Sequence, residues 1–179
     1  MLHQKETALL VIDVQGKLAE TVHEAERIRA NLQKLIQGAR LFDLPMVVTE
    51  QNPKGLGPTI PELQPMLEGA AFVSKTAFNA CLHSQFVEEV RKTGCRQMLV
   101  AGIETHICIY QTVAALLEES LEVHVAADAV SSRTVWDRTT ALERMRDMGA
   151  LIETTEMALF ELMKKAEGDN FKQFVRIVK

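Results

Sequence analysis

The sequence predicts an α/β protein: a three-layer α/β/α sandwich around a six-stranded parallel, Rossmann-like sheet. Three observations favour this fold class. Short apolar runs alternate with longer segments of helical periodicity along the chain. Several runs are continuously apolar, as in strands that are buried on both faces of a parallel sheet. No linker, repeat or low-complexity segment interrupts the alternation, so we expect a single domain over residues 1–179.

The apolar runs are the expected strands, and each is short enough to cross a sheet once. They are 8–13, 45–50, 70–75, 97–102, 121–128 and, with a weaker pattern, 149–154. Helices are expected over 24–41, 82–93, 106–119, 134–148, 155–166 and 170–178, where apolar residues recur at helical spacing. The order strand, helix, strand implies right-handed crossovers, which place helices on both faces of the sheet.

One long irregular stretch, 49–65, separates the second and third expected strands. It reads TEQNPKGLGPTIPELQP and holds four of the five prolines and two of the nine glycines. A loop of this length in a small domain is often functional, so we expect it to act as a lid over a site.

Composition excludes several classes of protein. The formal charge is −4 and the basic residues are scattered, which argues against a nucleic-acid partner. No run of about 18 apolar residues exists, so we expect no membrane span. The N-terminal stretch is interrupted by Asp13 and is not followed by a cleavage site, so it does not resemble a signal peptide. The cysteines, Cys81, Cys95 and Cys108, are odd in number and widely spaced, and a reduced, cytoplasmic setting is expected.

Metal and cofactor motifs are absent from the sequence. The five histidines form no HxH or HxxxH pair, so no metal site is predicted from spacing. Neither GxGxxG nor GxxxxGK[ST] occurs, so we expect no dinucleotide or nucleotide cofactor.

Reactive residues lie where the expected strands end. In doubly wound sheets, ligands bind beyond the carboxyl ends of the strands, where the strand order reverses. Asp13 ends the first apolar run and Lys75 ends the third. A carboxylate in such a place needs a partner, because burial disfavours its charge. Asp13 could instead cap a following helix, and Lys75 could extend its ammonium group to solvent.

Cys108 follows the strand-end residue Gly102 within six residues, at the start of an expected helix. Free cysteine is often only a small buried hydrophobic residue, and that interpretation stays open. As a nucleophile, Cys108 would need a lowered pKa, which a helix N-terminus and a nearby cation would both supply. The backbone N–H groups of the turn would then be free to hold an oxyanion.

Three motifs carry a resemblance to a known family. DVQ at 13–15, SKTAF at 74–78 and GIETHIC at 102–108 resemble the isochorismatase-like cysteine hydrolases. TEQNPKGLGPTIPEL at 49–63 and DAVSSR at 128–133 are most similar to the branch called isochorismatase domain-containing proteins. The resemblance spans essentially the whole chain, in the order and spacing of the family.

The resemblance implies a catalytic triad of Asp13, Lys75 and Cys108. It also implies a non-proline cis peptide bond between Ile103 and Glu104, which in the family helps to aim backbone N–H groups, including that of the cysteine, at the oxyanion. We expect the substrate pocket to include Gln15, Gln51, Phe78, Glu104 and His106. Members of the family are usually oligomers, so a homo-oligomer is expected.

Three features of this sequence distinguish it from particular branches of the family. The zinc-binding nicotinamidase branch carries an Asp and two His after its second strand, and TEQNPKGLG here has none of them. The position of His106 is often Asp in the amidase branches. Isochorismatases proper lack the cysteine, which this chain keeps as Cys108.

The resulting hypothesis is a metal-independent cysteine hydrolase without a cofactor. It would act on a small-molecule substrate, through attack of Cys108 on an amide and a thioester intermediate. The alternative is a non-catalytic or redox-sensing interaction protein on the same fold, because fold alone does not fix function.

Overall fold

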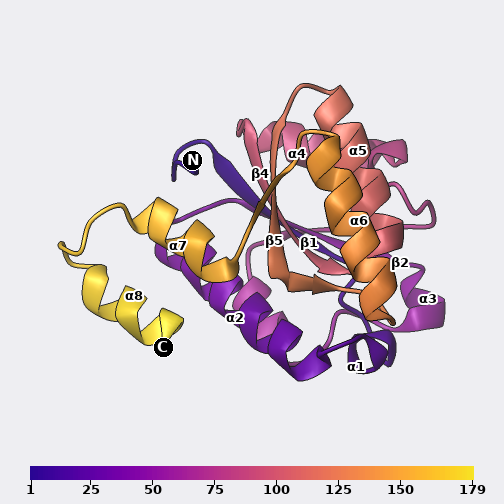
Figure 1. The fold of residues 1–179 in the computed structure, drawn as a ribbon, viewed down its shortest axis with the longest axis horizontal. Helices are drawn as coiled ribbons and strands as arrows, with labels where there is room; N and C mark the ends of the chain where they lie inside the picture. Colours follow the sequence, from indigo (N-terminus) through magenta and orange to yellow (C-terminus); the bar gives the residue numbers. More distant parts are fainter.

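A computed structural model describes residues 1–179 and contains one six-stranded sheet in which all strands are parallel (Figure 1). The strands are β1 (Thr7–Ile12), β2 (Met46–Gln51), β3 (Ala71–Lys75), β4 (Gln97–Ile103), β5 (Glu122–Ser131) and β6 (Leu151–Glu153). Their order across the sheet is β3-β2-β1-β4-β5-β6, which confirms the predicted fold class. The order reverses between β1 and β4, so the crevice beyond the carboxyl ends of these two strands is the expected ligand position.

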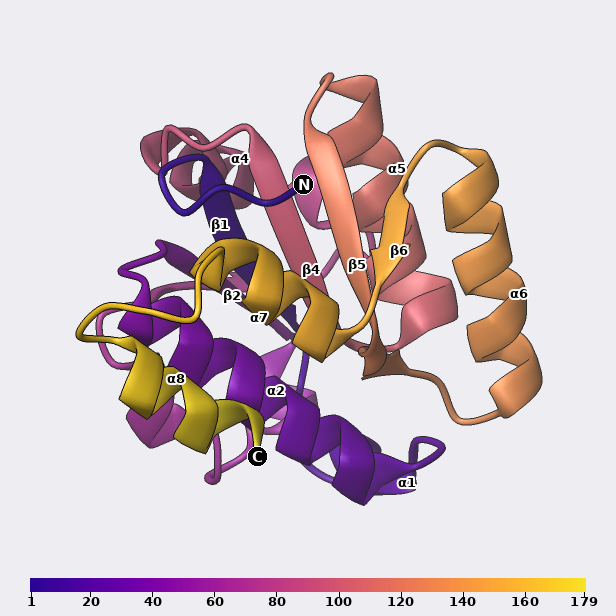
Figure 2. The ribbon, with the colours of Figure 1, turned by 60° about the vertical axis from the view of Figure 1, so that its left-hand side comes forward.

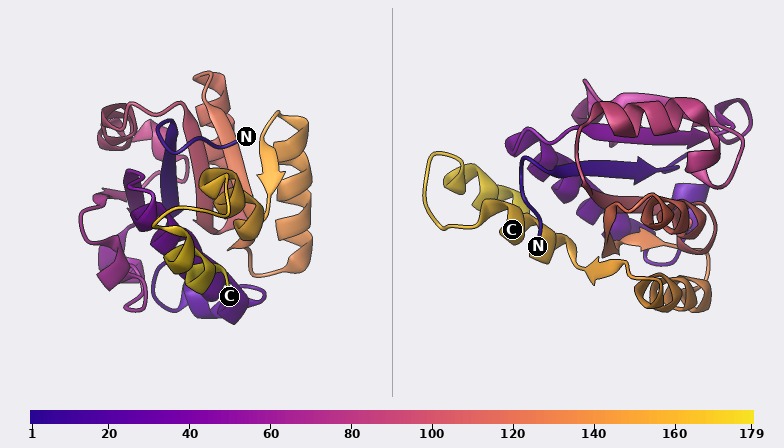
Figure 3. Two further views of the ribbon diagram at one scale, coloured as in Figure 1. Left: turned by 90° about the vertical axis from the view of Figure 1, so that its left-hand side faces the viewer. Right: turned by 90° about the horizontal axis from the view of Figure 1, so that it is seen from above.

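Helices cover both faces of the sheet, and the three layers are visible in Figures 2 and 3. One layer contains α2 (Ala25–Leu41), α7 (Thr155–Met163) and α8 (Phe171–Val178), and the other contains α4 (Ser84–Lys92), α5 (Tyr110–Glu118) and α6 (Val135–Asp147). Shorter helical segments lie in the connections: α1 (Leu18–Thr21), α3 (Pro53–Leu56), η1 (Gln64–Leu67), η2 (Ala80–Leu82) and the π-helical turn η3 (Thr105–Ile109).

Strand β1 shows why the sheet is a buried layer. All six of its residues are buried, and they alternate between two separate apolar clusters. Leu9 and Val11 pack with α2 and α7, whereas Leu10 and Ile12 pack with α4 and α5. The continuous apolar run in the sequence therefore reflects a helix layer on each side of the strand.

The segment predicted to be a lid is more ordered than the sequence suggested. Strand β2 continues to Gln51, and the short helices α3 and η1 follow. Thr59 pairs with Gln15 in an isolated antiparallel bridge, and Ile60 and Leu63 are buried in the core. The apolar residues of this second half therefore hold it against the core.

No helix in the structure combines the length and the apolar character that a membrane crossing requires.

Candidate active site

The centre of the candidate site is a buried ion pair between Lys75 and Asp13. Their side chains are almost inaccessible to solvent, and Lys75 Nζ lies 2.6 Å from Asp13 Oδ2. Lys75 Nζ also donates to Gln51 Oε1 at 2.8 Å and to the carbonyl oxygen of Ala77 at 3.2 Å, so each of its three protons has an acceptor. Thr49 Oγ1 donates to the other carboxylate oxygen of Asp13 at 2.6 Å. Both charges are therefore paired and hydrogen-bonded, as burial demands.

Strand register brings these residues together. Ile12 lies beside Thr49 in the β1–β2 pair, and Gln51 lies beside Lys75 in the β2–β3 pair. Asp13 directly follows β1, and its backbone N–H donates to the carbonyl oxygen of Thr49 at 3.1 Å. Because the strands are parallel, these side chains share the carboxyl edge of the sheet, where the sequence predicted them.

Cys108 completes the cluster from the other side of β1. It lies in η3, directly after β4, and only 7% of it is exposed. Its thiol is close enough to Asp13 and Lys75 for hydrogen bonds with both side chains to influence its pKa. The structure thus places Asp13, Lys75 and Cys108 together at the switch point of the sheet.

The expected lowering of the thiol pKa is wrong for the resting protein. Burial, together with the negative charge of Asp13, raises the pKa of Cys108 to about 12, and the opposing effect of Lys75 does not compensate. The sequence argument weighed the helix start and the cation, but it left out the desolvation of the thiol and the adjacent carboxylate. Cys108 is therefore a neutral thiol at rest, beside a carboxylate that can accept its proton.

The turn between β4 and η3 depends on Gly102. A Cβ atom at this position would lie 2.1 Å from the carbonyl oxygen of Ile12, and the φ angle of Gly102 is +126°. The next peptide bond, Ile103–Glu104, is cis, as the resemblance implied. The carbonyl oxygen of Glu104 accepts the N–H groups of Ile107 and Ile109 at 3.2 and 3.3 Å, so these two N–H groups are already engaged.

Two of the predicted pocket residues, Gln15 and Gln51, hold other parts of the site in place through hydrogen bonds. Gln15 is fully buried, donates to the carbonyl oxygens of Gln51 and Gly57 at 3.2 and 2.6 Å, and accepts the N–H of Gln51 at 2.6 Å. The Gln51 side chain donates to the carbonyl oxygen of Thr76 at 2.7 Å while it accepts a proton of Lys75. Gln15 thus fixes the end of β2, and Gln51 orients the lysine.

The other predicted pocket residues differ in how strongly they are held. Glu104 is buried, and its carboxylate accepts the Nε–H of Arg133 at 3.0 Å. His106 Nδ1 lies 2.9 Å from Ser132 Oγ, which fixes the orientation of the ring. Phe78 has no such tie and is 54% exposed. It is therefore the only exposed side chain among the candidate wall residues.

Sequence reasoning missed Thr49, which holds the carboxylate of Asp13. No local pattern in the sequence marks Thr49, because its contact with Asp13 depends on the register between β1 and β2.

The donor atoms around the site do not suit a metal ion. Thr49 and Lys75 donate to the carboxylate oxygens of Asp13, and the ammonium group of Lys75 occupies the place that a cation would take. The one group of His, Cys, Asp or Glu side chains close enough to share an ion is His124, Glu153 and Glu161, and none of these belongs to the candidate site.

Comparison with known proteins decides the family. The model of the isochorismatase domain matches residues 7–157. The chain belongs to the isochorismatase family. It is 38% identical to isochorismatase domain-containing protein 2 of Danio rerio, over 99% of this chain and 89% of that protein. It is 39% identical to isochorismatase domain-containing protein 2A of Mus musculus, over 96% of this chain and 82% of that protein.

Solved structures of isochorismatase-like proteins share this fold over almost the whole chain. A structure described as MAR1 ribonuclease from Caenorhabditis elegans has a TM-score of 0.93 and 36% identity, with 99% of this chain and 91% of that chain covered. YcaC from Pseudomonas aeruginosa, solved with hexane-2,5-diol and covalent acrylamide, has a TM-score of 0.94 and 29% identity, with coverage of 99% and 89%. The YcaC gene product of Escherichia coli, described as an octameric hydrolase of unknown specificity, has a TM-score of 0.90 and 26% identity, with coverage of 99% and 94%. Membership of this family supports a hydrolase.

Proposed function

We propose that this isochorismatase-like protein is a metal-independent cysteine hydrolase that cleaves a C–N bond of a small amide through a thioester on Cys108. The observation that carries the proposal is the buried Asp13–Lys75 ion pair beside Cys108 in the turn η3, which directly follows β4 at the same edge of the sheet. A thiol that only filled space in the core would need neither charge beside it, and burying such a pair costs free energy.

In the first half of the reaction, Asp13 accepts the proton of the Cys108 thiol while the sulfur attacks the amide carbon. The carbonyl oxygen becomes an oxyanion, which backbone N–H groups of the segment from Glu104 to Cys108, other than the engaged N–H of Ile107, stabilise. Losing one such donor typically costs about 3 kcal/mol of transition-state stabilisation. The C–N bond then breaks, and the amine leaves with the proton that Asp13 had accepted.

In the second half, water hydrolyses the thioester. Asp13 takes a proton from the water as its oxygen attacks the acyl carbon, and the C–S bond breaks. The sulfur recovers the proton from Asp13, and the carboxylic acid product leaves. Lys75 stabilises whichever of the two groups, carboxylate or thiolate, carries the negative charge, because it favours the charged form of Cys108.

The Pseudomonas aeruginosa relative gives independent support, since its structure contains covalent acrylamide. Acrylamide is a small amide and an electrophile that thiolates attack. Thiolates add to the alkene carbon of acrylamide and leave its amide intact, so the adduct supports a reactive nucleophile in a relative that is aligned over 99% of this chain, not amide cleavage as such.

RNA is a less suitable substrate, although one relative is described as a ribonuclease. This chain has a net charge of −4 with 20 basic and 24 acidic residues, whereas RNA-binding surfaces are basic. The mostly buried thiol also suits a small substrate.

A turnover screen tests the proposal. Purified protein is incubated with a panel of small aliphatic and aromatic amides and, separately, with an RNA oligonucleotide, and Cys108→Ala is the matched control. Release of ammonia or amine by the wild type alone supports the proposal. RNA cleavage that persists in Cys108→Ala would overturn it, and reversible oxidation of Cys108 without any turnover would favour the redox-sensing alternative.

We also propose that the protein forms a homo-oligomer and works in the cytoplasm. The three free cysteines, Cys81, Cys95 and Cys108, suit a reducing cytoplasm. The octameric Escherichia coli relative supports a homo-oligomer here. Val135 and Trp136, which are exposed together at the start of α6, are the apolar surface that we expect an assembly to cover.

A further inference from the structure

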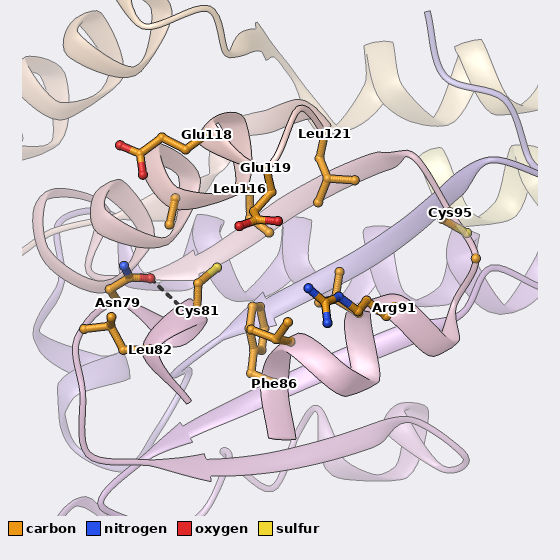
Figure 4. A pocket seen from close by; sticks show the side chains of 14 residues that line it. Asn79, Cys81, Leu82, Phe86, Arg91, Cys95, Leu116, Glu118, Glu119 and Leu121 are labelled. Atoms are coloured by element: carbon orange, nitrogen blue, oxygen red, sulfur yellow. Dashed lines mark hydrogen bonds between the residues drawn. The ribbon is translucent and has the colours of Figure 1, made fainter. Parts of the chain in front are cut away.

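A cavity of about 530 Å³ lies between α4, α5 and η2, apart from the candidate active site (Figure 4). None of Asp13, Lys75 and Cys108 lines it. Its volume falls within the range of small-molecule sites, about 300–1,000 Å³. The proposed hydrolase reaction makes no use of this cavity.

The inner wall of the cavity is apolar and comes from both helices. Phe86 and Val90 of α4 and Leu116 of α5 are buried side chains that line it, and Leu121 closes its far end. Cys81 lies in the wall formed by η2, where the Asn79 side chain accepts the N–H of Cys81 at 2.9 Å. These walls are fixed by packing, so the space is preformed for an apolar group.

Two opposite charges lie over this apolar wall. In Figure 4, the side chains of Arg91 and Glu119 are directed toward the space above Phe86 and Cys81, and Glu118, whose carboxylate is turned away in this view, also lines the cavity. Arg91 and Glu119 have no ion pair with each other or with any other residue, although the adjacent Lys92 is paired with Glu88 and Glu89. The charge of Glu119 reaches the cavity, because it adds to the effect of burial in raising the pKa of Cys81 to about 11.

We propose that this cavity binds a free α-amino acid with an apolar side chain. The carboxylate of the amino acid pairs with Arg91, its ammonium group pairs with Glu119, and its side chain packs on Phe86 and Leu116. This ligand carries both charges on one carbon and an apolar group beside them. A fatty acid would leave Glu119 unpaired, and an alkylamine would leave Arg91 unpaired, so each matches only half of the charges.

The experiment is a calorimetric titration of the full chain with L-leucine and L-phenylalanine. Two analogues serve as ligand controls: 4-methylpentanoate, which lacks the ammonium group, and 3-methylbutylamine, which lacks the carboxylate. We expect saturable binding of an amino acid and at least about tenfold weaker binding of both analogues. Arg91→Gln and Glu119→Gln should each weaken amino-acid binding by a similar factor, whereas Glu88→Gln, outside the cavity, should leave it unchanged.

A second readout locates the ligand without relying on those variants. Alkylation of Cys81 by N-ethylmaleimide, followed by peptide mass spectrometry, should slow when the amino acid is present, because the ligand covers the thiol. The proposal is overturned if neither amino acid binds, if 3-methylbutylamine binds equally well, or if binding leaves Cys81 alkylation unchanged. Unchanged binding in both Arg91→Gln and Glu119→Gln would also overturn it.

Discussion

Asp13 has two opposite effects on Cys108. In the resting protein its charge, added to burial, raises the pKa of the thiol, and in the proposed reaction it accepts the proton of that thiol. These effects separate when the carboxylate is replaced by an amide of nearly the same shape. Asp13 therefore offers the sharpest single-residue test of the mechanism.

In Asp13→Asn, we expect the pKa of Cys108 to fall, because the raising charge is removed while Lys75 remains. Alkylation of Cys108 by iodoacetamide at about pH 8 should therefore become faster, whereas amide turnover should slow by about 10²- to 10⁴-fold through loss of the base. Alkylation rates against pH and steady-state kinetics measure the two effects. Amide turnover that is unchanged in Asp13→Asn would contradict the assignment of Asp13 as the base.

Lys75 stabilises the folded protein as the counterion of Asp13, and variants of both residues can measure this effect. Lys75→Met leaves the carboxylate of Asp13 buried without a counterion, so we expect a loss of about 3–5 kcal/mol in the free energy of unfolding. The double variant Asp13→Asn/Lys75→Met removes both charges and should regain much of that loss. Urea unfolding measures both, and a double variant no more stable than Lys75→Met would contradict the ion-pair account.

At the scale of elements, the β1–β4 pairing depends on the glycine at the turn toward Cys108. In Gly102→Ala, the new Cβ would collide with the carbonyl oxygen of Ile12, in a backbone conformation that L side chains rarely adopt. We expect a loss of about 3 kcal/mol or more in the free energy of unfolding. Gly149→Ala is a useful comparison, since it also has a positive φ angle but no atom within 4 Å of the added Cβ. Equal losses in the two variants would show that the close approach to β1 does not matter.

Strands β5 and β6 are joined by a buried histidine whose charge depends on pH. Burial alone would lower the pKa of His124, but its hydrogen bonds with Glu153 and Glu122 outweigh burial and raise it. A raised pKa in the folded state contributes stability that is complete below the unfolded value, 6.5, and is lost as pH rises through the folded value.

We therefore expect the wild type to lose stability relative to His124→Gln as pH increases from about 6 to about 9. Urea unfolding at a series of pH values measures this difference, with His3→Gln as an exposed control. Parallel pH profiles for the wild type and His124→Gln would contradict the account.

The strands were predictable from sequence because burial on both faces leaves a continuous apolar run, as in residues 8–13. Asp13 and Lys75 were placed correctly because parallel strands end at one edge. Three features depend on contacts that no local pattern reveals: the support given by Thr49, the anchoring of Ile60 and Leu63, and the sign of the pKa change at Cys108.

At the scale of the whole molecule, the fold places a reactive cluster at the switch point of the sheet and a second cavity between α4 and α5. We also expect several copies of this chain to associate into a homo-oligomer. Sedimentation velocity should show a species larger than the 20.0 kDa chain, and Trp136→Glu should shift it toward the monomer. A wild type that sediments as a monomer at all concentrations would contradict this expectation.

The central claim is that Cys108 forms a thioester during turnover. The most direct measurement is intact mass spectrometry of protein that is mixed with an amide substrate and quenched in acid within milliseconds to seconds. The account predicts a mass increase equal to the acyl group, located on Cys108 by peptide mapping and absent in Cys108→Ala. Turnover of the amide without any acyl adduct on Cys108, or with full activity in Cys108→Ala, would contradict it.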